Sequence, residues 1–469
     1  MINKLYTDLT EAVKAVGLKD GMSISFHHHL RNGDYVLNMV MDVVASLGIK
    51  DITVCASSIF ACHEPLIGHI KNGVVTGIET NYMAGPVGRA VAEGILEKPV
   101  IFRSHGTRPS DIDHGRCHID VAFIAATTSD PCGNCTGMFG PSACGSLGYA
   151  FADAQKADKV VVVADNIVPY PLTQVSIREH YVDAVVKVDA IGDPKGIVSG
   201  TTSMPKDPIA LRIAETAAQA ISASGYLKDG FSFQTGAGGA SLAVAKFIRD
   251  EMKQKDIHGS YALGGITGYM VDMLEEGLFA SIQDVQCFDL KAVESLAKDP
   301  RHIEITASQY ASPTAKSSAA KNLDVVVLGA TQIDTDFNVN VHTDSNGFII
   351  GGSGGHTDVA EDAKLTVIVA PLSRARMSIV VDHCITVSTP GRCVDLLVTQ
   401  YGIAVNPART DLKEKLLAAH LKVVDITELK NIADRLNGPS SGYKRSSEKV
   451  VAKVLGRDSQ VQDVIYQVK

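Results

Sequence analysis

The sequence predicts an α/β protein with two similar open domains, each built on a mainly parallel sheet. The chain has 469 residues, and single hydrophobic cores stop growing at about 250–300 residues, so two domains are expected. Uninterrupted apolar runs of strand length, IDVAFIAA from Ile119 and LDVVVLGA from Leu323, are typical of strands buried on both faces of a parallel sheet. A pattern that begins at Leu18 returns at Leu227, which predicts an internal duplication.

The repeat can be followed element by element. LKDGMSISF in the first copy and LKDGFSFQ in the second read as a turn and a strand, and each is followed by a polar or glycine-rich loop. An apolar helix pattern comes next, YVLNMVMDVVASLG or LAVAKFIRDEM, and then a second strand, ITVCAS or SYALGG. Farther along, DKVVVVAD and KLTVIVAP are again buried-strand patterns. We expect the boundary near residues 222–226, which gives domains 1–224 and 225–469.

Composition narrows the class of protein. Lys and Arg number 44 and Asp and Glu 52, a net charge of −8, which argues against general nucleic-acid binding. No apolar stretch has the length of a membrane span, and nothing at the N-terminus resembles a signal peptide. The nine scattered cysteines are therefore expected to be free thiols in a reducing cytoplasm. Cys132 and Cys135 have CxxC spacing; a structural role is favoured over zinc or redox chemistry because no second pair follows.

In open α/β sheets ligands bind outside the carboxyl ends of the strands, so two facing domains would place a site between them. The segment HHHLRNGD, residues 27–34, directly follows the strand MSISF. Arginine offers bidentate contacts to carboxylates and histidine donates or titrates near neutral pH. We predict an anion site here, with a solvated, histidine-rich turn as the alternative. The segment SHGTR, residues 104–108, offers the same chemistry after the strand PVIFR, with a plain loop as its alternative.

Two glycine-rich loops also follow predicted strands. TGAGGAS, residues 235–241, could present backbone N–H groups to an anion or an acyl oxygen, or be only a tight turn. GGSGGHTD, residues 351–358, holds too many glycines for one turn and predicts an oxyanion hole. Upstream, Phe337 to Val341 alternates apolar and amide side chains, which predicts a strand with Asn338 and Asn340 on one face. After the strand SYALGG, the sequence offers Thr267 and no nucleophilic carboxylate or cysteine.

These residues carry a resemblance to a known family. HHHLRNGD, HIDVAFIAA, SACGSLGYA, DGFSFQTGAGGASLAVA, GGIT, DVQCFD, DFNVNV, GGSGGHTDVA and VTQYGIAVNP resemble, in this order, the signatures of the citrate lyase alpha subunits, over essentially the whole chain. The second half also resembles the wider CoA-transferase superfamily, whose covalent members carry a catalytic glutamate. That glutamate would fall at about Gly268. Its absence agrees with what the resemblance to citrate lyase alpha subunits implies, which is direct attack of one carboxylate on the thioester of the other acid, without an acyl-enzyme.

The resemblance implies two CoA-transferase-like domains with the active site between them. It implies a transferase that converts an acetyl thioester and citrate into citryl thioester and acetate through a mixed anhydride. The co-substrate would be the phosphopantetheine-type thioester of an acyl carrier protein, a CoA derivative, and no metal is expected in this subunit. An acyl carrier protein subunit, a lyase (beta) subunit and further copies of this chain are the implied partners.

Each step of the implied reaction needs particular contacts, and the candidate residues are assigned to them as follows. Binding of the acid is assigned to His28, His29, Arg31, Ser104, His105, Arg108, Thr267, Asn338 and Asn340. Stabilisation of the tetrahedral oxyanions is assigned to Gly238, Gly239, Gly354, Gly355 and His356. Contact with the thioester arm is assigned to Gly236, Gly264, Gly265, Gly351, Gly352 and Ser353.

Three alternatives stay open. The acid could be citramalate or another hydroxy acid, because such pockets resemble one another. The chain could be a catalytically weakened scaffold of a lyase complex, for which SHGTR in place of an expected SHGGR and Gln332 in place of an expected glutamate are the motivation. A sugar-phosphate isomerase or deaminase on a similar fold is the third, and the duplication and the GGSGGH loop argue against it.

Overall fold

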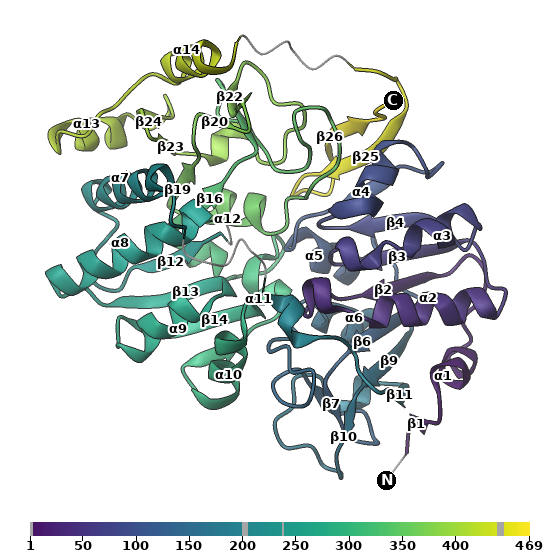
Figure 1. Ribbon diagram of the computed structural model, residues 1–469. Helices are drawn as coiled ribbons and strands as arrows, with labels where there is room; N and C mark the ends of the chain where they lie inside the picture. Colours follow the sequence, from purple (N-terminus) through teal and green to yellow (C-terminus); the bar gives the residue numbers. More distant parts are fainter. Residues whose placement is uncertain (1–2, 199–204, 237–238, 439–444) are drawn as a thin grey trace.

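The computed structural model describes residues 3–198, 205–236, 239–438 and 445–469. Within these residues the chain forms two lobes, each with a large sheet flanked by helices (Figure 1). The first lobe holds most of the N-terminal half and the second most of the C-terminal half. The fold is thus the mixed α/β class with mainly parallel sheets that the apolar runs predict.

The described part of the first sheet has ten strands, all parallel to their neighbours except for the final hairpin. In spatial order they are β1 (Leu5–Tyr6), β11 (Ala184–Lys187), β9 (Lys159–Ala164), β6 (Val121–Ala125), β2 (Ser23–Phe26), β3 (Ile52–Ala56), β4 (Val75–Thr80), β5 (Val100–Phe102), β25 (Val450–Leu455) and β26 (Val461–Tyr466).

The second sheet has eight strands among the described residues and is parallel except for the β23–β24 pair. In spatial order they are β15 (His302–Glu304), β14 (Phe279–Cys287), β13 (Gly259–Ile266), β12 (Ser232–Thr235), β16 (Val325–Gly329), β19 (Leu365–Val369), β23 (Leu396–Thr399) and β24 (Gly402–Val405). The order β9-β6-β2-β3-β4-β5 of the first sheet is matched by β19-β16-β12-β13-β14-β15 of the second.

The remaining elements cover the sheets or form small ribbons. The α-helices are α1 (Leu9–Ala15), α2 (Val36–Ser46), α3 (Leu66–Lys71), α4 (Gly85–Ala92), α5 (Thr107–Asp113), α6 (Phe151–Lys156), α7 (Pro208–Ser224), α8 (Gly239–Lys255), α9 (Gly268–Glu275), α10 (Leu290–Lys298), α11 (Ala307–Ala311), α12 (His356–Asp362), α13 (Thr410–Ala418) and α14 (Ile426–Asn437). The short strands are β7 (Thr128–Ser129), β8 (Cys135–Thr136), β10 (Asn166–Ile167), β17 (Gln332–Asp334), β18 (Val339–Asn340), β20 (Ser373–Arg374), β21 (Met377–Ser378) and β22 (Val380–Val381).

The apolar runs form the central strands because both faces of each strand are covered. Every residue of β6 and β19 is buried, and so is all of β9 beyond its first residue. A strand of this kind needs a continuous apolar run, because no side chain faces water. The predicted strands at 119–126 and 158–165, and their counterparts in the second half, are therefore confirmed.

One predicted strand is much shorter than expected. The alternating pattern of Phe337–Val341 predicts a strand through both asparagines, but β18 contains only Val339–Asn340. Phe337 has a φ of +66°, and the side chain of Asn338 donates to Asp334 Oδ2 at 3.1 Å. A left-handed residue and a local side-chain bond form a turn, so the two amides do not share one face of a strand.

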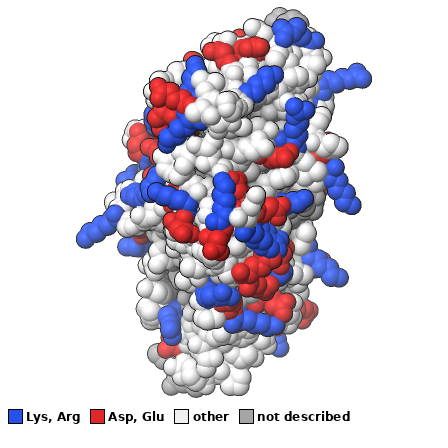
Figure 2. Space-filling view, turned by 90° about the vertical axis from the view of Figure 1, so that its left-hand side faces the viewer, with Lys and Arg blue, Asp and Glu red and all other residues white. Residues whose placement is uncertain are grey.

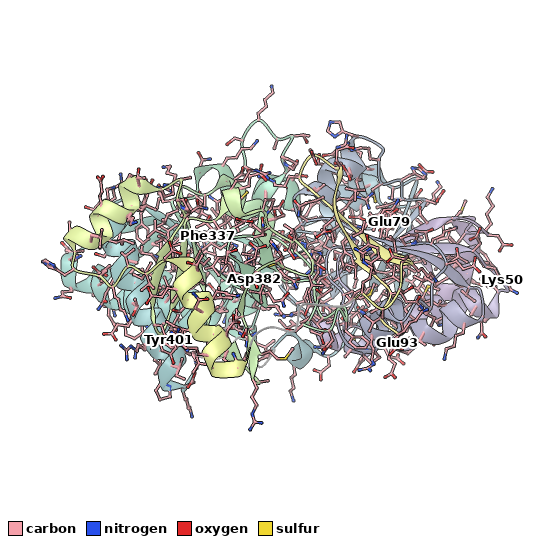
Figure 3. All side chains as sticks on the ribbon, turned by 90° about the horizontal axis from the view of Figure 1, so that it is seen from above. Lys50, Glu79, Glu93, Phe337, Asp382 and Tyr401 are labelled. Atoms are coloured by element: carbon pink, nitrogen blue, oxygen red, sulfur yellow. The ribbon has the colours of Figure 1, made fainter. Side chains whose placement is uncertain are left out.

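Two segments cross the predicted division between residues 224 and 225. Helix α7 ends at Ser224, with the left-handed Gly225 as its cap, and packs on α8 and β19 of the second lobe (Figure 1). The C-terminal hairpin β25–β26 joins the first sheet beside β5. Seen from above, the C-terminal segment lies over the lobe that carries Glu79 and Glu93 (Figure 3). There Gln467 Nε2 donates to Glu93 O at 2.9 Å.

The lobes meet along the segment 145–149, which leads into α6. Gly148 approaches the second lobe so closely that a Cβ on it would lie 2.5 Å from the backbone oxygens of Val285 and Ile305. Ser146 Oγ donates to the backbone oxygen of Asp284 at 3.0 Å. Only a glycine permits this approach, and the contact holds Tyr149 over the ends of the second sheet.

The surface carries both charge signs. On the face shown in Figure 2, lysines and arginines are interspersed with acidic side chains. On α9, Asp272 and Glu275 both pair with Lys291, so they form the solvated helix face that the amphipathic pattern predicts. Within the described ranges, no helix combines the length and the apolar character that crossing a bilayer requires. Cys132 and Cys135 are both buried free thiols.

Candidate functional site

A cavity of about 430 Å³ opens between the two lobes and is lined by residues of both. Its size lies within the range of small-molecule sites, about 300–1,000 Å³. The first lobe supplies the loops after β2, β3, β4 and β5. The second supplies the ends of β12, β13, β14 and β16 and the loops after β12, β14, β16 and β18. The cavity therefore lies at the carboxyl ends of both parallel sheets, where open α/β sheets bind ligands.

The cavity brings together about half of the sequence-predicted site residues. Those in its wall are His28, Arg31, His105, Gly236, Gly265, Gly352, Ser353, Gly354, Gly355 and His356. Predicted residues that are described but do not line it are His29, Ser104, Arg108, Gly239, Gly264, Thr267, Asn338, Asn340 and Gly351. Gly238 lies outside the described residues.

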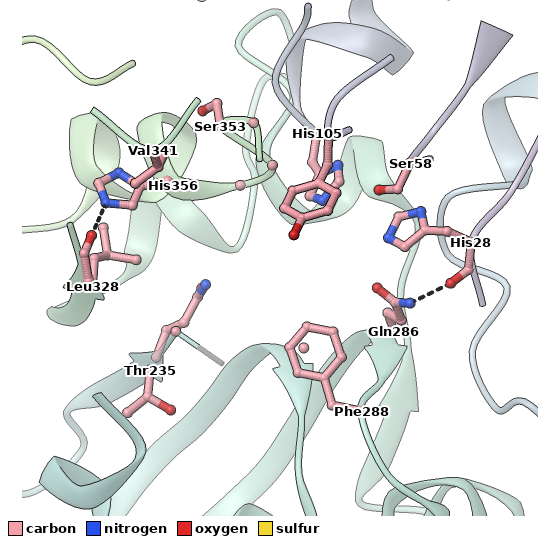
Figure 4. A pocket seen from close by; sticks show the side chains of 18 of the residues that line it. His28, Ser58, His105, Thr235, Gln286, Phe288, Leu328, Val341, Ser353 and His356 are labelled. Carbon is pink, nitrogen blue, oxygen red and sulfur yellow. Dashed lines mark hydrogen bonds between the residues drawn. The ribbon is translucent and has the colours of Figure 1, made fainter. Parts of the chain in front are cut away.

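Two histidines and a tyrosine form one wall. The ring of Tyr149 lies 4.7 Å from that of His28 and 4.3 Å from that of His105, measured between centroids. His28 is held by a 2.6 Å hydrogen bond between its Nδ1 and Ser57 Oγ, whereas Nδ1 of His105 has no partner within the described chain. Figure 4 shows both imidazoles on the same side of the cavity. The pair offers ring nitrogens to a ligand.

Burial disfavours the protonated form of both His28 and His105. Burial lowers the pKa of His105 to about 3, with a smaller contribution from the nearby charge of Arg108. Burial and then the neighbouring His105 hold the pKa of His28 well below its usual value. Desolvation penalises an imidazolium in both places. A bound anion would act in the opposite direction, so these side chains can become charged when one enters.

Arg31 is one of the two arginines in the described wall of the cavity. It begins the short 3-10 helix Arg31–Gly33 with a φ of +53°. Its guanidinium lies over the rings of Phe288, 4.8 Å from the centroid, and Phe60, 5.7 Å away. Its Nη1 is buried without a hydrogen-bond partner among the described residues. Because a buried donor without a partner is costly, Nη1 is available to an acceptor that enters the cavity.

No Asp, Glu or Cys occurs in the described part of the cavity wall. An anionic ligand would therefore meet donors and two arginine cations, without a fixed negative charge from the described wall beside it. The wall also lacks the carboxylate and thiol nucleophiles on which covalent acyl transfer relies. Gly268, where the superfamily glutamate would fall, starts α9 behind the wall, and its N–H donates to Asp289 Oδ2 at 2.5 Å.

The loop of residues 351–356 passes close to His105. The N–H of His105 donates to Gly354 O at 2.8 Å. A Cβ on Gly354 would lie 3.2 Å from His105 Nε2, and its φ of +52° is left-handed. The left-handed conformation favours glycine there, and a Cβ would press on the ring of His105.

The N–H groups of the glycine loops are not equally available. Gly354 N–H donates to Asn81 O at 3.1 Å, and Gly236 N–H donates to Val327 O at 2.8 Å. The N–H of Gly355 has no acceptor within the described part of the chain. It also lies at the start of α12, where the helix dipole favours negative charge. Among the described loop residues that line the cavity, Gly355 therefore shares a free backbone N–H with Gly352 and Ser353, whereas the N–H of Gly354 is occupied.

His356 lines the cavity, but both of its ring nitrogens are occupied. Nε2 lies 2.9 Å from Gly329 O, and Nδ1 lies 2.8 Å from Thr389 Oγ1. A carbonyl can only accept, so Nε2 carries the proton and Nδ1 accepts from the threonine hydroxyl. Burial lowers the pKa of this ring to about 4. His356 thus anchors the loop and has no nitrogen left for a substrate, contrary to the catalytic role assigned from the sequence.

Arg108 and Ser104 serve the protein framework. Both terminal nitrogens of Arg108 donate to the carboxylate of Asp153, at 2.6 Å and 2.5 Å, and this carboxylate also pairs with His27 at 3.2 Å. Ser104 Oγ donates to Asp358 Oδ1 at 2.6 Å. Their bonds are satisfied behind the wall, so neither faces a ligand, although the sequence assigns both to binding of the acid.

The remaining residues outside the cavity have internal roles. Asn340 is fully buried and donates to Gln332 Oε1 and to Thr343. His29 stacks on His27 with their centroids 5.7 Å apart. Gln332 and Thr107, on which the scaffold alternative depends, do not line the cavity. Gln332 acts there as an acceptor, a role that an amide oxygen performs as a carboxylate would.

Several wall residues were missed from the sequence. Tyr149 lies in the motif SACGSLGYA and Gln286 in DVQCFD, so both are within segments that carry the family resemblance. Gln286 Nε2 donates to His28 O at 2.8 Å across the lobes (Figure 4). Tyr310 accepts from Gln234 Nε2 at 3.0 Å, and no motif marks it. Arg374 is the one exposed residue among the described wall residues, so it marks the mouth.

Clusters that could hold a metal ion lie elsewhere. Three groups of ligating side chains come together in the described chain: Cys55 with Glu79 and Cys117, His118 with Asp120 and Asp158, and Asp130 with Cys132 and Glu179. None of these residues lines the cavity. The second partner of the CxxC motif, Cys135, belongs to none of the groups.

The similarity of this protein to known proteins extends over nearly the whole chain. The family model for citrate lyase, alpha subunit (CitF), matches residues 2–468. Over 466 residues the chain is 49% identical to the citrate lyase alpha chain of Escherichia coli (strain K12), covering 99% of this chain and 91% of that one. The alpha chain of Haemophilus influenzae is 48% identical over 466 residues, covering 99% and 93%.

Solved structures agree with this result. A Streptococcus mutans protein assigned as the alpha subunit of citrate lyase, solved in complex with citrate, is 50% identical, with a TM-score of 0.98, and covers 100% of this chain and 92% of that one. The malonate decarboxylase alpha subunit of Acinetobacter baumannii is 14% identical, with a TM-score of 0.69 over 94% of each chain, and shares the fold. This chain belongs to the citrate lyase alpha subunit family.

Proposed function

We propose that this chain transfers the thioester of an acyl carrier protein from acetate to citrate. The observation that carries the proposal is the cavity itself: a half-buried Arg31 whose buried Nη1 has no partner among the described residues, two histidines whose pKa is lowered by burial, and no acidic side chain in the described wall. A tricarboxylate satisfies the arginine and can raise the pKa of both imidazoles. The citrate held by the Streptococcus mutans relative supports the choice of acid.

The reaction begins when a carboxylate oxygen of citrate attacks the carbonyl carbon of the acetyl thioester. A C–O bond forms, the C–S bond breaks, and the thiolate leaves with the bonding electrons, which gives a mixed anhydride. The thiolate then attacks the citryl carbonyl of the anhydride. A new C–S bond forms, the C–O bond to the citryl group breaks, and acetate leaves. The absence of a carboxylate or thiol from the described wall supports this route without an acyl-enzyme.

Both steps pass through a tetrahedral oxyanion. We assign the donor to the free N–H of Gly355, with His105 within reach of the same loop through its bond to Gly354 O. Removal of one such donor costs about 10²–10³ in rate in other enzymes. Much of the remaining acceleration would come from holding both acyl partners at short distance in one cavity.

The carrier arm would enter at the mouth marked by Arg374. Its exposed guanidinium lies beside the loops of the second lobe, where Gly236 and Gly265 line the cavity. A phosphopantetheine-type arm carries a phosphate, which arginine binds well. In this proposal the carrier, a lyase (beta) subunit and further copies of this chain assemble around the cavity in the cytoplasm, and the subunit requires no metal.

We also propose that the two lobes are duplicated units divided near residues 224 and 225. The matching strand orders support this proposal. The hairpin β25–β26 and helix α7 would then be exchanged across the division, since each packs on the other lobe. The active site would lie between the units, because each contributes the carboxyl ends of its strands to the cavity.

An exchange assay tests the function. The protein is mixed with acetyl carrier protein and citrate, and mass spectrometry follows citryl thioester, with citramalate, malate and no acid in parallel. Arg31→Ala should lower the rate at least about tenfold, as expected for loss of a charged hydrogen bond of about 1.5–3 kcal/mol. Arg212→Ala, on an exposed position of α7, is the matched control. Failure of the wild-type protein to exchange with any hydroxy acid would leave the scaffold as the better account.

A further inference from the structure

Asp358 connects two cavity loops that belong to different lobes. It lies in the first turn of α12 and is fully buried. Its Oδ1 accepts a hydrogen bond of 2.6 Å from Ser104 Oγ, and its Oδ2 accepts one of 2.8 Å from the N–H of Gly106. These donors flank His105 in the sequence. One carboxylate thus holds both sides of the residue that faces the cavity.

The same loops touch a second time at the cavity surface. His105 N–H donates to Gly354 O at 2.8 Å, and Gly354 precedes Asp358 by one turn of chain. The contact at Asp358 consists of a carboxylate with two donors, Ser104 and Gly106. Hydrogen bonds to a charged group are about twice as strong as neutral ones. The contact at Asp358 therefore controls how the His105–Gly354 hydrogen bond is aligned.

A third segment completes the anchor. Arg457, from the turn between β25 and β26, lies 3.4 Å from Asp358 Oδ1 and donates twice to Asp362, at 2.8 Å and 2.9 Å. The C-terminal hairpin thereby reaches under α12. Arg457 binds Asp362 more closely, so the strong bonds of Asp358 are those to the loop that carries His105.

We propose that Asp358 is a positioning residue for the transfer reaction, which sets the distance between His105 and the free N–H of Gly355. The inference rests on the proposed function. Asp358 does not line the cavity, so it acts through the two loops and not on the substrate. A misplacement of about 1 Å at reacting groups can cost about 10²-fold in rate.

The protonation state of Asp358 matters to this role. Burial raises its pKa to about 6, against the opposing effects of Arg457, Ser104 and Gly106. The charged and titratable groups that face it are Arg457 from the hairpin, Asp362 on its own helix, Tyr149 before α6 and Tyr310 on α11. A protonated carboxyl must itself donate from one oxygen, so it loses one of the two bonds between the lobes. The rate should therefore fall as the pH decreases through about 6.

The test compares Asp358→Asn with Asp362→Asn in the exchange assay. Asp362 shares Arg457 but makes no bond to the loop at Ser104. Asp358→Asn should lower kcat by about 10²-fold, change the KM for citrate little, and remove the decline in rate near pH 6. Asp362→Asn should keep kcat and the decline. A normal kcat and an unchanged pH profile in Asp358→Asn would overturn the inference.

Two further measurements keep the test decisive. If Asp358→Asn does not fold, Ser104→Ala removes one of the same bonds without burying a new group, and it should lower kcat in the same direction. Hydrogen–deuterium exchange of segments 104–108 and 351–358 needs no activity. It should become faster in both segments for Asp358→Asn and in neither for Asp362→Asn. A wild-type protein that catalyses no acyl exchange would reject the proposed function. Unchanged hydrogen–deuterium exchange in both segments of Asp358→Asn would reject the role of Asp358.

Discussion

Gln286 donates a hydrogen bond of 2.8 Å to the backbone oxygen of His28, although 258 positions separate them in the chain. The bond links the carboxyl end of β14 in one lobe to the second residue after β2 in the other. It fixes the turn from which His28 and Arg31 reach into the cavity. Alignment of the anion site therefore depends on a residue of the opposite lobe.

Replacing this amide tests that dependence. In Gln286→Glu the shape is kept, but the carboxylate cannot donate to His28 O and adds a negative charge to a wall whose described part has none. The KM for citrate should rise at least tenfold, and the free energy of unfolding should fall by about 1–3 kcal/mol, the cost of a buried group left unpaired. Steady-state kinetics and denaturant titration measure the two effects.

Gln462→Glu is the matched control, because Gln462 Nε2 also donates to a backbone oxygen, that of Val387, at 2.7 Å. It lies outside the cavity wall. The control should lose stability without a change in KM. An equal rise of KM in both variants would show that the effect is general loosening.

Arg31→Lys should behave almost as poorly as the alanine variant. A lysine keeps the charge, but it lacks the planar, bidentate donor pair and stacks less well between the rings of Phe60 and Phe288. We expect the KM for citrate to rise about tenfold while kcat changes less. Isothermal titration with citrate gives the affinity directly, and wild-type affinity in Arg31→Lys would contradict a bidentate contact.

Gly354→Ala should damage both folding and catalysis. The left-handed φ of +52° costs an L-residue about 1–2 kcal/mol. Gly277→Ala is the control. Gly277 has a φ of +76° with open space around its Cβ position, so an alanine there has the backbone strain without a steric contact. Only Gly354→Ala pushes against His105 Nε2. We expect similar losses of stability in thermal melts and a fall of kcat in the first variant only; equal kcat values would contradict the contact.

Protonation of His105 should make the folded state sensitive to acid. Its pKa is lowered by burial to about 3 in the folded protein, against about 6.5 for an unperturbed histidine. Between these values the unfolded chain binds a proton that the folded chain refuses. The stabilising contribution is therefore present above pH 6.5 and is lost as the pH falls toward 3.

Measurement of the free energy of unfolding against pH checks this sign. In His105→Asn the slope between pH 6.5 and 4 should decrease by up to about one bound proton. His118→Asn is the control, because His118 is 58% exposed and lies outside the cavity. Identical slopes for His105→Asn and the wild type would show that His105 titrates normally.

Arg374→Ala should weaken binding of the carrier thioester and leave binding of citrate unaffected. The residue lies at the mouth, so loss of its charge should raise the KM for acetyl carrier protein several-fold, and added salt should reduce the difference. Arg376 stands two positions away on the same hairpin turn and does not line the cavity. Equal effects of Arg374→Ala and Arg376→Ala on the KM for the carrier would contradict a specific contact at the mouth.

Local periodicity was sufficient for the central strands. The apolar runs at Val121–Ala125 and Leu365–Val369 predict strands covered on both faces, and both are found. The segment Phe337–Val341 shows where periodicity fails. Alternation in five residues predicts a strand, but the left-handed Phe337 and the bond from Asn338 to Asp334 form a turn. The conformation of such a short segment is decided by side-chain hydrogen bonds that its apolar pattern does not reveal.

Arg31 and Arg108 illustrate the division between sequence and tertiary structure. The sequence alone determined that each arginine follows a parallel strand within a few residues, and that the carboxyl ends of such strands meet at one edge of a sheet. The loop expected around Arg108 is wrong, because α5 already begins at Thr107. Only the tertiary structure decided that Asp153 neutralises Arg108, while Arg31 lies between two aromatic rings and faces the cavity. The physical reason is that a strand pattern reflects burial of neighbouring residues, whereas the partner of a charge is chosen among groups brought close by folding.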